Sequence, residues 1–117
     1  MRSDNQILQD SRNFAIRIIR MYKYLHDEKK EHVLSKQVLR SGTSIGANVR
    51  ESVNAQSRMD FINKLNIALK EANETEYWLD LLHATDFIGD EEFISINNDC
   101  SKIVATLTKI IKTMKEK

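Results

Sequence analysis

The sequence contains no proline, only three glycines and a single cysteine among its 117 residues. β-Sandwiches, barrels and repeated βαβ folds need many turn residues between their strands, so this shortage argues against all three. One cysteine can form neither an internal disulfide framework nor a cysteine-cluster zinc site. Cys100 lies within an apolar helical pattern, which predicts a small buried core residue. The composition therefore indicates an all-α protein with few connections.

Long apolar runs are also missing, and the N-terminal segment has no hydrophobic signal core. We therefore expect a cytoplasmic protein without a membrane span. Aromatic residues make up only 7%, which disfavours a sheet surface that stacks bases. The formal net charge is +1, so any attraction to nucleic acid must come from where the charges lie.

Apolar residues recur with helical spacing in four stretches, which predicts helices over about 4–27, 31–54, 58–87 and 91–115. The expected core stripe of the first helix consists of Ile7, Ser11, Phe14, Ile18, Met21 and Leu25. That of the third helix consists of Phe61, Leu65, Ala68, Ala72, Thr75, Leu79 and Leu82. That of the fourth helix consists of Phe93, Asn97, Cys100, Val104, Leu107, Ile111 and Met114. Ile96, Ile103 and Ile110 form a second stripe on the last helix. Residues 1–117 are therefore expected to form one domain, an antiparallel up-down-up-down four-helix bundle.

Local signals mark the ends of the later helices. Ser57 followed by Asp60 resembles a capping box at the start of the third helix. Gly89 fits a left-handed position at the end of that helix, and Asp90 fits the N-cap of the next.

The second helix contains Gly42 and Gly46, which each cost about 1 kcal/mol in helix propensity. A loop is the alternative, but apolar residues keep helical spacing from Leu34 to Val53. The two glycines share one face of the helix, because they lie four residues apart. We therefore predict a helix in which they admit a neighbouring backbone closely.

Apolar residues exceed what one core requires, for example Ile67, Trp78 and Leu81 outside the main stripe of the third helix. This excess predicts self-association. A wide core face is the alternative interpretation.

Charge is unevenly distributed along the chain. Residues 71–100 contain nine acidic residues and no lysine or arginine, whereas residues 101–117 contain five lysines and one glutamate. An up-down bundle would gather basic residues at one end, namely Arg2, Arg12, Arg50, Arg58, Lys64, Lys109, Lys112, Lys115 and Lys117, opposed by Asp4, Asp10, Glu51, Asp60 and Glu116. The far end would carry Asp80, Asp86, Asp90, Glu91 and Glu92.

This asymmetry has two interpretations. The first is a surface for the phosphates of RNA or DNA, with Arg12, Arg58, Lys64, Lys109 and Lys112 as the candidate contacts. The second is that acids at helix starts and lysines at helix ends only complement the helix dipoles.

Catalytic patterns are weak. No nucleophile triad order, Walker loop, dinucleotide-binding glycine motif or redox CxxC is present. Glu76, Asp80 and His83 share a helix face, but a di-metal bundle would need a second such set from other helices. We therefore expect no metal, no cofactor and no enzymatic activity.

Polar residues also occur within the second helix. Arg40, Asn48 and Glu51 are interpreted as a structural network that fixes helix register, in which Asn48 and Glu51 can share one partner. A ligand site is the alternative.

The segment from Gln37 to Phe87 resembles the four-helix-bundle proteins encoded within intervening sequences of bacterial 23S ribosomal RNA genes. The most specific residues are Gln37, Arg40, Ser44, Ile45, Asn48 and Glu51, followed by Ser57, Phe61, Ala68, Glu74, Glu76 and Tyr77. These proteins are related to the accessory proteins of diversity-generating retroelements. The resemblance implies a homopentamer without catalysis, and the retroelement relatives imply nucleic acid or a nucleic-acid-processing protein as a partner.

Two functions remain open at this point. One is an oligomeric scaffold or adaptor with RNA or DNA at its basic end. The other is a purely structural, self-associating bundle that acts through protein partners alone.

Overall fold

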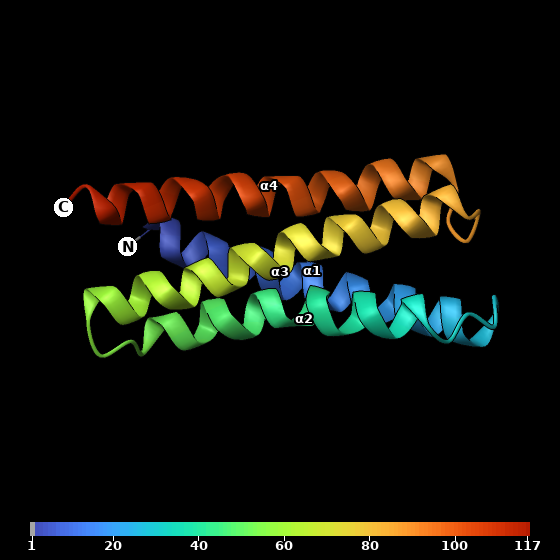
Figure 1. Ribbon diagram of the computed structural model, residues 1–117, viewed down its shortest axis with the longest axis horizontal. Helices are drawn as coiled ribbons and strands as arrows, with labels where there is room; N and C mark the ends of the chain where they lie inside the picture. Colours follow the sequence, from blue (N-terminus) through green and yellow to red (C-terminus); the bar gives the residue numbers. More distant parts are fainter. Residues whose placement is uncertain (1) are drawn as a thin grey trace.

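The computed structural model describes the backbone of residues 2–117 and the side chains of residues 6–117. Four helices, α1 (Arg2–Asp27), α2 (Leu34–Val53), α3 (Arg58–Ala84) and α4 (Asp90–Lys115), account for nearly all of this part of the chain. They lie side by side in an elongated body of 46 × 21 × 19 Å (Figure 1). The prediction of an all-α fold with four helices is confirmed. None of these helices is long and apolar enough to cross a bilayer within the described residues.

Contacts between consecutive helices are consistent with the antiparallel order predicted from the short connections. Lys64 of α3 pairs with Glu51 of α2, and nearer the other end of the bundle Arg40 of α2 pairs with Glu74 of α3. Residue numbers therefore rise along one helix as they fall along the other. In Figure 1 the chain reverses direction at each connection, and both termini lie at the same end as the α2–α3 connection.

The core is a continuous cluster of aliphatic side chains between the four helices. All six predicted stripe residues of α1 are buried. On α4 the centre of the core face differs from the prediction, because Ile96, Ile103 and Ile110 are buried whereas Asn97 is only half-buried. The second stripe of α4 therefore belongs mostly to the core of this bundle.

Cys100 is fully buried, as predicted, and its thiol donates to the carbonyl oxygen of Ala72 at 3.4 Å. Burial raises the pKa of the Cys100 thiol to about 12, and the nearby carboxylates of Glu76 and Asp99 act in the same direction. The thiol is therefore protonated at neutral pH and serves as a packing residue.

The end of α3 differs from the sequence prediction. The helix ends at Ala84 rather than near Phe87, and Asp86 (φ 66°), not Gly89, adopts the left-handed conformation. The N–H of Phe87 then donates to the carbonyl oxygen of Leu82 at 2.9 Å, which closes the helix end. Gly89 (φ −81°) is the N-cap of α4, and Asp90 is its first residue. The predicted cap at Ser57 is present, since its hydroxyl accepts the N–H of Asp60 at 3.0 Å.

The start of α2 is set by Glu31, which the sequence analysis placed inside the helix. Its carboxylate accepts the N–H groups of Val33 at 3.1 Å, Leu34 at 3.0 Å and Ser35 at 2.7 Å. Partial burial acts to raise the pKa of Glu31, but the backbone donors of Ser35, Leu34 and Val33 outweigh it, so the pKa lies below its ordinary value of 4.5. A charged carboxylate therefore caps α2.

We expect Glu31→Gln to lower the free energy of unfolding by about 1 kcal/mol at pH 7, because a neutral amide accepts these N–H groups less strongly. A lowered pKa means that the stabilisation is present above the ordinary pKa and is lost as pH falls through the folded-state pKa. Urea unfolding near pH 7 and about pH 3 measures this, with exposed Glu28→Gln as control. A Glu31→Gln effect that is equal at both pH values would contradict the cap.

Candidate functional site

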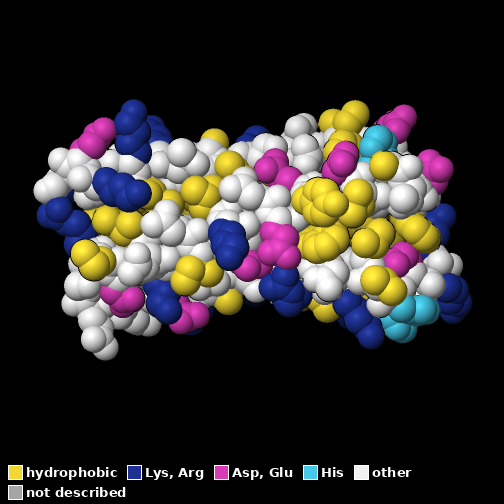
Figure 2. Space-filling model, viewed as in Figure 1, with side chains coloured by type: hydrophobic (Ala, Val, Ile, Leu, Met, Phe, Trp, Pro, Cys, Tyr) yellow, Lys and Arg dark blue, Asp and Glu magenta, His cyan; other side chains and the backbone are white. Residues whose placement is uncertain are grey.

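The predicted nucleic-acid residues lie toward one end of the bundle. Arg58 is the first residue of α3, and Lys109 and Lys112 lie in the last turns of α4. Arg12 lies farther along α1, and all four side chains are exposed. Figure 2 shows lysine and arginine side chains gathered at the end where Figure 1 places both termini.

These residues do not form a single patch. Arg12 and Arg50 line a groove between α1 and α2, whereas Lys112 and Lys115 line a separate groove between α3 and α4. Lys64 lies at the α2–α3 contact, where its ammonium is 3.3 Å from the Glu51 carboxylate. The side chains of Arg2 and Asp4, also predicted at this end, lie outside the described residues. Cationic groups therefore surround the basic end on different faces.

The opposite end is mixed rather than acidic, which corrects the simple charge separation predicted from sequence. A hollow of about 600 Å³ there is lined by Arg20 and Lys29 as well as by Asp86 and Glu92. The α1–α2 connection brings Lys29 and Lys30 to this end, in addition to the acidic residues predicted there. Figure 2 accordingly shows both signs of charge, together with histidines, at this end.

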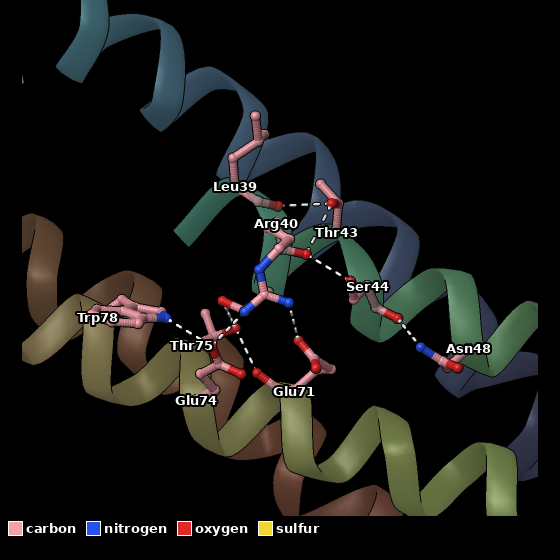
Figure 3. A network of polar contacts seen from close by, with 10 residues as sticks. Leu39, Arg40, Thr43, Ser44, Asn48, Glu71, Glu74, Thr75 and Trp78 are labelled. Carbon is pink, nitrogen blue, oxygen red and sulfur yellow. Dashed lines mark hydrogen bonds and ion pairs between the residues drawn. The ribbon is translucent and has the colours of Figure 1, made fainter. Parts of the chain in front are cut away.

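Arg40 links α2 to α3 (Figure 3). Its guanidinium forms an ion pair with Glu74 and lies 3.5 Å from the Glu71 carboxylate. The Glu71 side chain is only 14% exposed, and its Oε2 has no hydrogen-bond partner within the described chain. Glu74 also accepts the indole N–H of Trp78 at 3.3 Å. Arg40 is therefore the cation that compensates a nearly buried carboxylate.

The other two residues of the predicted network do not join Arg40 or each other. The Asn48 amide donates to the carbonyl oxygen of Ser44 on its own helix at 2.8 Å, whereas Glu51 pairs with Lys64. The prediction that Asn48 and Glu51 share one partner is therefore wrong. Two separate α2–α3 ion pairs, at Arg40 and at Glu51, cross this interface instead.

A buried pair of hydroxyls lies beside Arg40. Thr75 Oγ1 is 2.9 Å from Ser41 Oγ and donates to the carbonyl oxygen of Glu71 at 2.7 Å. Sequence reasoning placed Thr75 in the core stripe but missed Ser41 and Glu71. The available signal was the spacing of Glu71 and Thr75, which lie four residues apart and therefore share a face of α3.

The glycines of α2 lie against α1, where Gly46 meets a neighbouring backbone as predicted and Gly42 meets the side chain of Ile18 instead. A β-carbon at Gly42 would lie 2.8 Å from Ile18 Cγ1, and one at Gly46 would lie 3.2 Å from the carbonyl oxygen of Ser11. Distances this short leave no room for a side chain at Gly42 without movement of Ile18.

The alternative metal set on α3 does not converge. His83 Nε2 lies 2.7 Å from the Asp90 carboxylate, and its ring stacks on Phe93 with centroids 4.3 Å apart. Glu76 instead accepts the hydroxyl of Ser101 at 2.9 Å. Within residues 6–117, no group of three or more histidine, cysteine or carboxylate side chains could hold a metal ion.

Comparison with solved structures finds a close match to this bundle. The crystal structure of a protein with unknown function from the S23 ribosomal protein family of Bacteroides thetaiotaomicron superposes with a TM-score of 0.93. The two sequences are 62% identical, and the match covers 94% of this chain and 98% of that one. None of the curated proteins compared with the chain matches it.

Fold and surface together define a small all-α bundle with one basic end. Residues 3–109 match the model of the 23S rRNA-intervening sequence protein family. The chain therefore belongs to this family, and the resemblance noted for residues 37–87 extends over most of its length.

Proposed function

We propose that this protein is a non-enzymatic, self-associating scaffold of the cytoplasm, built as an antiparallel up-down-up-down bundle whose basic end binds RNA or DNA. The observation that carries the proposal is the set of exposed cations around that end, among them Arg12, Arg58, Lys109 and Lys112. Phosphates on several faces can approach such an end, and a second copy of the bundle would multiply the available cations.

Exposed apolar side chains support self-association. Ile67 is 42% exposed, Tyr77 56% and Met59 73%, all on α3. Figure 2 shows hydrophobic side chains grouped over the second half of α3. Large apolar groups that remain exposed in one bundle are suited to burial between copies.

We expect an oligomer in solution, and a homopentamer follows from the family resemblance. Multi-angle light scattering at micromolar concentration measures the mass directly. A stable species near the monomer mass of 13.6 kDa would contradict the scaffold.

Binding to nucleic acid is expected to depend weakly on sequence and steeply on salt, because phosphate contacts release counterions. Fluorescence anisotropy with labelled single strands and duplexes, from about 50 to 300 mM salt, tests this. Lys36→Gln removes one positive charge from the exposed surface of α2 near the opposite end and serves as the control for charge loss alone. If the wild-type protein binds none of these probes at low salt, the charge distribution only complements the helix dipoles and does not form a nucleic-acid surface.

The second candidate is a purely structural bundle that acts through protein partners, including a nucleic-acid-processing protein. The exposed Tyr77 favours this alternative, because it lies in the half of α3 away from the basic end. A protein that self-associates but binds no nucleic acid would favour it.

A further inference from the structure

The groove between α1 and α2 is lined by cations without a carboxylate, whereas carboxylates line both the hollow at the opposite end and the α3–α4 groove. Its volume is about 550 Å³, within the range of roughly 300–1,000 Å³ typical of small-ligand sites. Its charged lining residues are Arg12 and Arg50, and no carboxylate lines it. Neither arginine forms an ion pair with residues 6–117.

Small residues account for the depth of this groove. Gly46 and Ala47 on α2 face Ala15 on α1, and Leu8 adds an aliphatic side chain. The close approach of Gly46 to the Ser11 carbonyl brings the helix axes together here, and short side chains leave the space above them open. The floor is therefore apolar and the rim cationic.

Polar, uncharged groups complete the lining. The side chains of Gln9, Asn13 and Thr43 offer both hydrogen-bond donors and acceptors at the groove. An anion with a flat apolar face and polar edges matches this combination. A nucleotide within a single strand has all three features, whereas the bases of a duplex are stacked inside and cannot reach an apolar floor.

We propose that the α1–α2 groove holds a segment of single-stranded nucleic acid, with Arg12 and Arg50 on its phosphates and one base over Gly46 and Ala47. This inference rests on the proposed nucleic-acid function and places it on one face of the basic end. Aromatic residues do not line the groove, so base contact comes from aliphatic packing. The groove therefore favours single strands without reading their sequence.

The test compares two charge-matched double variants by anisotropy, using fluorescein-labelled U20, dT20 and a duplex. Arg12→Gln with Arg50→Gln is expected to weaken single-strand binding at least tenfold at about 50 mM salt. The magnitude of the salt slope should fall by about 1.4, since each single-strand phosphate contact contributes about 0.7. Lys23→Gln with Lys36→Gln removes the same charge from the exposed surface of α1 and α2 toward the opposite end, and should change binding less than threefold.

A third variant tests the floor without altering charge. Ala47 is exposed, so Ala47→Leu should fold and fill the groove. We expect weaker binding of U20 and dT20, with duplex binding unchanged. Comparison of U20, which carries 2′-hydroxyls, with dT20, which does not, shows whether the 2′-hydroxyl contributes to binding.

Several outcomes would overturn the inference. Equal losses from both double variants would mean that binding depends on general charge and not on this groove. Loss of self-association in the Arg12 and Arg50 variant, with unchanged strand binding, would assign the groove to a second copy of the chain. If the wild type binds no probe, the proposed nucleic-acid function itself is wrong. If binding survives the loss of both arginines, only its assignment to this groove is wrong.

Discussion

Replacing Gly42 with leucine is expected to lower the free energy of unfolding by about 3 kcal/mol or to prevent cooperative folding. The β-carbon alone would lie 2.8 Å from Ile18 Cγ1 and 2.9 Å from Cγ2, well inside the optimum of about 3.5–4.0 Å. Ile18 is fully buried and cannot swing into solvent. The better helix propensity of leucine recovers only about 1 kcal/mol, so overpacking dominates. Thermal and urea unfolding measure the loss.

Two comparisons separate crowding from a general effect of leucine. Ala105→Leu on the exposed face of α4 should stay within about 0.5 kcal/mol of the wild type. Gly46→Leu should cost less than Gly42→Leu, because its nearest neighbour is at 3.2 Å and the α1–α2 groove lies beside it. Adding Ile18→Ala to Gly42→Leu should cost less than the sum of the single changes. Wild-type stability in Gly42→Leu would show that α1 and α2 do not pack this closely.

Arg40→Ala is expected to lower the free energy of unfolding by about 1–2 kcal/mol. The change removes the cation from Glu71, whose side chain is 14% exposed and whose Oε2 has no hydrogen-bond partner in the described chain. An uncompensated buried charge is costly, and the exposure of Arg40 keeps this loss below that of a fully buried pair. Urea unfolding of the single and double variants gives the coupling energy.

The partner substitution identifies the cause. Glu71→Gln in the Arg40→Ala background should recover part of the stability, because the neutral amide needs no cation. Lys36→Ala, also on the exposed face of α2, provides the control and should change stability by less than about 0.5 kcal/mol. Absence of recovery would mean that Arg40 acts through packing of its aliphatic stem.

Pairing across the α2–α3 interface also explains an error of the sequence interpretation. Arg40, Asn48 and Glu51 lie on one helix, so spacing suggested mutual contact. The structure instead pairs Arg40 and Glu51 with residues of α3 and turns Asn48 back to its own backbone. Helical spacing fixes which residues share a face but not which side chain of the facing helix meets them.

The sequence by itself determined the four helices, the α1 core stripe, the cap at Ser57 and the close approach at Gly42 and Gly46. Each depends on local periodicity or on the absence of a side chain, and both can be read along one helix. The start of α2 was misplaced because a glutamate side chain, Glu31, caps it from outside the usual set of N-cap residues.

Only the tertiary structure decided how the basic residues are distributed around the bundle. Arg12 faces a groove with α2, Lys112 faces one with α3, and Lys64 is paired with Glu51. Their shared end follows from chain order and helix length. Their separation onto different faces depends on the rotation of each helix about its axis, which is set by how the whole core packs.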